Sequence, residues 1–121
     1  QAYTLLPQVM QDAAAGVLAP IVVIQTGNNG VIDGSQLTAT LNALRSRHRV
    51  VLVTVHVPRP WKNHNLDLIT DAARQFPNVR LMQWNNRVTA DRRLVVHDGI
   101  HLTLRGINVY AAMVVHAALS R

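Results

Sequence analysis

Three short apolar runs, rich in β-branched residues, alternate along this chain with stretches whose apolar residues recur at helical spacing. The runs occupy residues 21–24, 50–55 and 79–82. Continuous apolar runs are typical of strands that are covered on both faces, and strands that alternate with helices favour an α/β fold with a parallel sheet. The sequence therefore predicts the order helix, strand, helix, strand, helix, strand, helix.

The helical stretches are recognised by apolar residues three or four positions apart. The first lies between Leu5 and Ala13, and the second carries Leu37, Leu41 and Leu44 and begins after a cap at Gly34-Ser35. The third spans residues 66–73, and the last spans residues 104–119 with Thr103 as its N-cap. Residues 87–96 have no regular pattern and are expected to be irregular.

Length and composition limit the classes of protein that fit. The chain has 121 residues, which is enough for one small domain, and 49% of them are apolar, so it can bury a core. It has no cysteine, which excludes disulfide scaffolds, thiolate metal sites and cysteine nucleophiles. No paired-histidine spacing and no phosphate-binding glycine motif is present, so we expect neither a metal nor a cofactor.

The net charge of +6 comes from 12 basic residues against six acidic ones. The basic residues gather in two places, Arg45 to Arg49 and Arg92-Arg93, and neither is interleaved with aromatic residues. Base stacking on single-stranded nucleic acid needs such aromatics. A solvated basic surface is therefore favoured over a nucleic-acid interface.

Ligands of parallel sheets bind beyond the carboxyl ends of the strands, so the residues there are candidates for function. Thr26-Gly27-Asn28-Asn29-Gly30 follows the first strand. Its glycines allow a sharp turn and a close approach to a ligand, and the Asn29 amide can donate to an oxyanion. An ordinary turn is the alternative, because Asn and Gly are common turn formers.

A second candidate is Asp98-Gly99-Ile100-His101, just before the last helix. A carboxylate three residues before a histidine can accept a hydrogen bond from one ring nitrogen and leave the other as a general base. The alternative is a helix cap beside a surface histidine.

A third candidate is the loop from His56 to Trp61, which Pro58 and Pro60 stiffen. Arg59 and Trp61 can line a pocket there, although an ordinary rigid loop with an exposed tryptophan fits equally well.

Together, and in this order along the chain, the motifs resemble the SGNH (GDSL-type) esterase family. The resemblance is greatest to the extracytoplasmic SGNH domain that is fused to bacterial membrane-bound O-acyltransferases. It implies a three-layer, flavodoxin-like parallel sheet with a Ser-His-Asp acyl-transfer site. In that site His101 is the base, Asp98 orients it, and Asn29 with Gly27 forms the oxyanion hole. Arg59 and Trp61 match a pocket-lining loop.

The chain departs from the family at the nucleophile. The Gly-Asp-Ser turn is absent, and none of the three serines, Ser35, Ser46 and Ser120, follows a predicted strand. In the family that turn precedes the Gly-x-Asn motif. Residues 1–121 are therefore expected to be the C-terminal two-thirds of one SGNH-like domain. The N-terminal segment of the same protein, as a separate chain, or self-association would complete the sheet beside the first strand.

The function implied by the resemblance is serine-dependent ester hydrolysis or O-acyl transfer, with an acyl donor and a carbohydrate acceptor as partners. The location implied is extracytoplasmic, with a membrane-anchored parent protein. Two alternatives from the residues alone are a non-catalytic α/β binding module and, less favoured, a basic nucleic-acid-binding domain.

Overall fold

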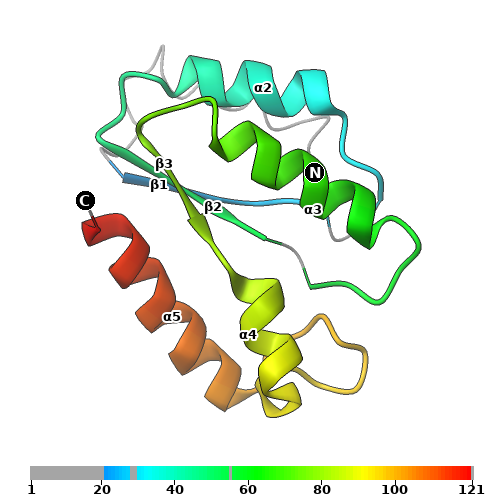
Figure 1. Cartoon of the computed structure of the whole chain (residues 1–121). Coiled ribbons are helices and arrows are strands. Elements are labelled where there is room, and N and C mark those ends of the chain that lie inside the picture. Colours follow the sequence, from blue (N-terminus) through cyan, green and yellow to red (C-terminus); the bar gives the residue numbers. More distant parts are fainter. Residues whose placement is uncertain (1–20, 28–29, 55, 121) are drawn as a thin grey trace.

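The computed structural model describes residues 21–27, 30–54 and 56–120, and the helix expected between Leu5 and Ala13 lies outside them. The predicted α/β class is confirmed (Figure 1). The elements in chain order are β1 (Ile21–Gln25), α2 (Gly34–Ala43), β2 (Arg49–Val53), α3 (Lys62–Ala73), β3 (Val79–Met82), α4 (Trp84–Ala90), the 3₁₀ helix η1 (Arg92–Leu94) and α5 (Leu104–Leu119).

The three described strands form one parallel sheet in the order β1-β2-β3. Val22 pairs with Val50, and Val50 pairs with Val79. The central strand begins one residue before the predicted run of residues 50–55 and ends at Val53. Its four apolar residues are buried, as that run predicts, and Arg49 is buried as well. In β1, by contrast, Ile21 is 37% and Val23 is 43% exposed, although both side chains are apolar.

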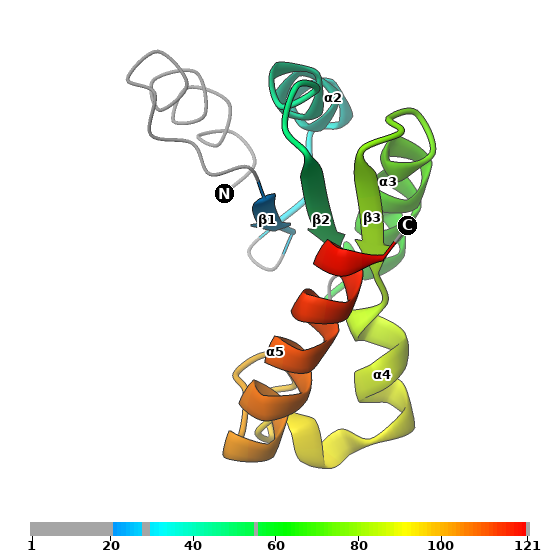
Figure 2. The ribbon, with the colours of Figure 1, turned by 90° about the vertical axis from the view of Figure 1, so that its left-hand side faces the viewer.

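Helices cover both faces of the sheet, which gives three layers. Figure 1 and Figure 2 show α2 and α3 on one face and α5 on the other. Successive residues of a strand point to opposite faces, so β2 contributes to two clusters. Val50 and Leu52 pack toward α2 and α3, whereas Val51 and Val53 pack with residues of α4 and α5.

Two helix starts test the expected caps. The cap expected at Gly34-Ser35 is wrong by one position: Asp33 is the N-cap of α2 and accepts hydrogen bonds from the backbone N–H groups of Ser35 and Gln36. A carboxylate caps because it accepts from the free N–H groups of the first turn. The cap expected at Thr103 is confirmed, since its hydroxyl accepts from the Gly106 N–H at 3.1 Å.

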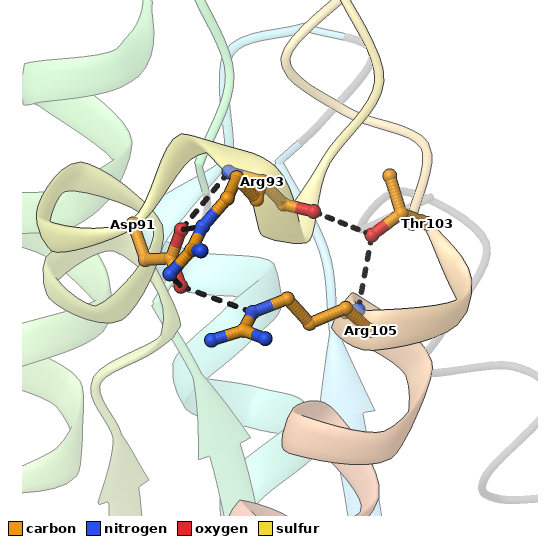
Figure 3. Close-up of polar contacts among 5 residues, drawn as sticks. Asp91, Arg93, Thr103 and Arg105 are labelled. Carbon is orange, nitrogen blue, oxygen red and sulfur yellow. Dashed lines mark hydrogen bonds and ion pairs between the residues drawn. The ribbon is translucent and has the colours of Figure 1, made fainter.

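The stretch expected to be irregular, residues 87–96, contains the second half of α4 and all of η1. Asp91, which is the N-cap of η1, joins this part to α5, as Figure 3 shows. Its carboxylate accepts from Arg93 Nε at 2.8 Å and from Arg105 Nε at 3.2 Å. The Thr103 hydroxyl also donates to the Arg93 carbonyl at 2.6 Å. These contacts fix the two ends of the segment between η1 and α5.

Candidate active site

The segment between η1 and α5 is a short hairpin. Val95 and Leu102 form an antiparallel bridge, and the Val96 N–H donates to the His101 carbonyl at 2.8 Å. Gly99 lies in the turn with φ of +75°, a conformation that residues with a side chain rarely adopt. Its N–H donates to the Val96 carbonyl at 2.9 Å. The hairpin thus holds Asp98 and His101 on one turn.

The Asp98 carboxylate uses both oxygens to organise this turn. Oδ2 accepts a hydrogen bond from His101 Nδ1, as the spacing predicted. Oδ1 accepts from the backbone N–H groups of Ile100 at 2.8 Å and of His101 at 3.0 Å. The hydrogen bond from His101, and after it those two N–H groups, holds the pKa of Asp98 well below its usual range. The carboxylate is therefore ionised at neutral pH.

The other ring nitrogen of His101 faces outward. The His101 side chain is 78% exposed, against 33% for Asp98. No described group is hydrogen-bonded to its Nε2. Because Nδ1 donates to the carboxylate, Nε2 of the neutral imidazole carries a lone pair that can take a proton. This arrangement is what a general base needs, and the catalytic role itself stays a prediction.

The end of β1 is held by a buried amide. Asn65 on α3 is fully buried, and its Nδ2 donates to the carbonyls of Gly27 at 3.0 Å and Gly30 at 2.8 Å. Its Oδ1 accepts from the Ile32 N–H at 2.8 Å. Gly27 has φ of +98°, so the turn there depends on a glycine. Asn29, the expected oxyanion donor, lies outside the described residues.

Sequence reasoning did not single out Asn65. The available signal was its position four residues before Ile69, on the face of α3 that also buries Ala72. A polar residue in a core position must find hydrogen-bond partners, and a neighbouring loop can supply them.

The loop after β2 holds the remaining candidates. Trp61 is half-buried at the start of α3 and packs against the core, and its indole N–H is buried without a hydrogen-bond partner among the described residues. Arg59 is exposed and donates to the Pro58 carbonyl at 3.0 Å. Their substrate-binding role stays a prediction. His56, to which no role was assigned, is buried and contacts the hairpin through Gly99.

The three serines lie at helix ends or in a turn. The hydroxyls of Ser35 and Ser120 donate to the Asp33 carboxylate and the Ala117 carbonyl. The backbone carbonyl of Ser120 accepts from the side chain of Arg49, the first residue of β2, so Ser120 lies at the amino edge of the sheet. Ser46 follows α2 in the turn that leads into the same edge. None of the three follows a strand of the described sheet.

Within residues 21–27, 30–54 and 56–120, no cluster of three histidine or acidic side chains is placed to hold a metal ion. None of the helices in these ranges combines the length and hydropathy that a membrane span requires.

No protein-family model matches the chain. Relatives of the chain include bacterial O-acetyltransferases. The peptidoglycan O-acetyltransferase OatA of Listeria monocytogenes is 33% identical over 92 residues, which is 76% of this chain and 14% of that protein. A protein of Bacillus subtilis provisionally named peptidoglycan O-acetyltransferase YrhL is 29% identical over 99 residues, 82% of this chain and 16% of its own length.

A protein of Staphylococcus aureus strain MSSA476, provisionally named an O-acetyltransferase, is 34% identical over 86 residues. That alignment covers 71% of this chain and 14% of the relative. The chain thus spans about one-seventh of the length of the relatives it matches. The chain is similar in sequence to one segment of bacterial O-acetyltransferases.

Proposed function

We propose that this chain supplies the base and part of the oxyanion hole of an SGNH-type serine acyltransferase, which transfers an acetyl group to a carbohydrate hydroxyl or to water. The observation that carries the proposal is the Asp98–His101 pair, whose exposed Nε2 is free of hydrogen bonds to the described residues. The similarity to named O-acetyltransferases supports acetyl as the acyl group.

In the complete site, His101 Nε2 takes the proton of a serine hydroxyl while the serine oxygen attacks the acetyl carbonyl. Asp98 stabilises the imidazolium through Nδ1. The tetrahedral intermediate collapses as His101 returns the proton to the leaving alcohol, which leaves an acetyl-serine. His101 then deprotonates the acceptor hydroxyl, whose oxygen attacks the acetyl-serine. Collapse of the second intermediate releases the acetylated product, and the proton returns to the serine.

The oxyanion of both intermediates needs donors that are already in place. We assign this role to Asn29, with the backbone near Gly27 as the turn that presents it. Supporting this assignment, Gln25 pairs with Val53, so the segments after β1 and β2 leave the same edge of the sheet. His56 from the second of these segments contacts the hairpin of Asp98 and His101.

We place the nucleophilic serine on another segment, which would pair with the free edge of β1. Among the described residues β2 is the only strand hydrogen-bonded to β1. Ile21 and Val23 are exposed on the face of β1 that Gln25 shares, and Gln25 accepts from the Tyr110 hydroxyl of α5 at 2.8 Å. An added strand and its helix would cover this apolar surface and remove the open edge.

The relatives named for peptidoglycan suggest its sugars as the acceptor of this chain also, with an extracytoplasmic site of action. The resemblance to SGNH domains of membrane-bound O-acyltransferases would make the parent protein membrane-anchored.

The test uses the 121-residue chain alone and fused behind the segment that precedes it in the parent gene. A fluorophosphonate probe labels activated serines, and mass spectrometry follows acetyl transfer from 4-nitrophenyl acetate to a chito-oligosaccharide. We expect labelling and transfer only in the fused protein, and loss of both in His101→Gln but not in His97→Gln, an exposed neighbour in the hairpin. Labelling of Ser35, Ser46 or Ser120, or an inert fused protein, contradicts the proposal.

A further inference from the structure

We infer that His56 is a positioning residue that fixes the Asp98–His101 hairpin against the sheet, an inference whose catalytic consequence rests on the proposed function. His56 is 7% exposed, and its Nδ1 lies 2.8 Å from the Gly99 carbonyl oxygen. A carbonyl oxygen only accepts, so Nδ1 carries the proton and donates.

Packing reinforces this hydrogen bond. A Cβ placed on Gly99 would lie 3.2 Å from Cγ and Cδ of Pro58 and 3.8 Å from Cε1 of His56. The backbone of Gly99 therefore lies directly against the segment that follows β2. A glycine permits this close approach as well as the positive φ of the turn.

The hydrogen bonds inside the hairpin fix its shape but not its position. Asp98 binds the N–H groups of Ile100 and His101, and Val96 pairs with Gly99 and His101. Among the described residues, the His56–Gly99 bond is the one hydrogen bond that joins residues 96–102 to the segment after β2. Because Gly99 directly follows Asp98, a shift of the Gly99 carbonyl moves the carboxylate and the imidazole together.

Asp98 and His56 therefore have different roles. Asp98 orients the imidazole within the turn, and His56 sets where the turn stands relative to the end of β2. A nucleophile and its base must meet within hydrogen-bond reach, and a misplacement of about 1 Å can lower turnover about 100-fold. His56 thus acts on the reaction through Gly99, without touching the substrate.

The test compares His56→Asn with His56→Gln in the full 121-residue chain. The Asn side chain places an amide donor near the position of Nδ1, whereas the Gln amide lies one carbon further out. Both variants are polar, which limits differences in folding, and the urea unfolding midpoint of each is measured alongside. His97→Asn, at an exposed position of the same hairpin, is the matched control.

The readout is the ¹H–¹⁵N spectrum of the imidazoles with amide exchange at Ile100 and His101. In His56→Asn and His97→Asn we expect the downfield Nδ1–H signal of His101 to be retained and the amides of Ile100 and His101 to exchange slowly. In His56→Gln we expect that signal to broaden and both amides to exchange about tenfold faster. Unchanged signals in His56→Gln, or a loss in His56→Asn equal to that in His56→Gln, overturn the inference.

A second readout separates this inference from the proposed function. In the fused protein, His56→Gln should lower kcat by about 10- to 100-fold with KM unchanged, and His56→Asn should restore most of it. An inert fused wild type with the expected spectra refutes the proposed function and leaves the positioning role standing. An active fused protein in which His56→Gln keeps full kcat refutes the positioning role alone.

Discussion

One oxygen of the Asp98 carboxylate accepts from the imidazole of His101, and the other accepts from the backbone N–H of the same residue. The carboxylate therefore orients the ring and closes the turn that carries it. These two tasks can be separated by mutation, because they use different oxygens.

The substitution Asp98→Asn keeps the closing of the turn and removes the correct orientation of the His101 ring. The amide oxygen can keep the bonds to the backbone N–H groups of Ile100 and His101, while its NH₂ group faces Nδ1 and favours the wrong tautomer. We expect the hairpin to persist and kcat of the fused protein to fall by about 10³- to 10⁴-fold. Ester hydrolysis measures the effect, and Asp67→Asn on the exposed side of α3 is the control. Full activity in Asp98→Asn would remove the pair from the mechanism.

The stability of the chain should depend on pH through Asp91. The hydrogen bond from Arg93, assisted by Arg105, holds the pKa of Asp91 well below its usual range. The contribution of this carboxylate to the free energy of unfolding is complete above the pKa that Asp91 has in the unfolded chain. It is lost as the pH falls toward the lower pKa that Asp91 has in the folded chain. In urea unfolding we expect wild type and Asp91→Asn to differ by a constant amount above about pH 5, and we expect this difference to shrink progressively as the pH falls below about 4.

Asp71→Asn is the matched control for that experiment. The Asp71–Arg74 pair lies 3.5 Å apart with both side chains more than half exposed, so it should contribute little. A loss in Asp71→Asn equal to that in Asp91→Asn would show that the tie between η1 and α5 does not stabilise the fold.

Gly106 is required by a close approach of α5 to η1. A Cβ on this residue would lie 1.8 Å from the Leu94 carbonyl oxygen. Gly106→Ala should therefore lower the free energy of unfolding by at least about 1–3 kcal/mol, measured with urea. Gly34→Ala is the control, because its Cβ meets only the two methyl groups at the end of the Leu68 side chain, at 3.1 and 3.9 Å. Equal stability of the two variants contradicts this packing.

The sequence predicted the strands and α5 because their patterns are regular over several residues. It missed α4 and η1 because their buried residues, Trp84, Val88 and Leu94, are separated by polar residues and by the break at Asp91. Burial of those side chains depends on α5, which packs against them, and Tyr110 meets the Trp84 ring edge-on with centroids 5.0 Å apart. Local periodicity carries no signal for such a contact.

The difference between local patterns and contacts made by the fold also decides what could be predicted of the site. Asp98 and His101 are three residues apart, so their hydrogen bond could be predicted from spacing alone. The partners of Asn65 are 33 to 38 residues away in sequence, and Gly99 is 43 residues from His56. Only the fold brings these residues together, and the sequence offered no more than a polar residue within an apolar pattern.

Asn65 supports the last prediction. Asn65→Ala leaves two carbonyls and the Ile32 N–H without their partner in a buried site, and a buried unsatisfied group costs about 1–3 kcal/mol. We expect the free energy of unfolding to fall by about 2–4 kcal/mol and the Ile32 amide to exchange faster than the amides of β2. Asn63→Ala, exposed on the same helix, should change neither. Because the turn at Gly27 would lose its anchor, the fused protein should also lose turnover. If exchange at Ile32 stays slow in Asn65→Ala, other contacts hold that turn and Asn65 does not position the oxyanion segment.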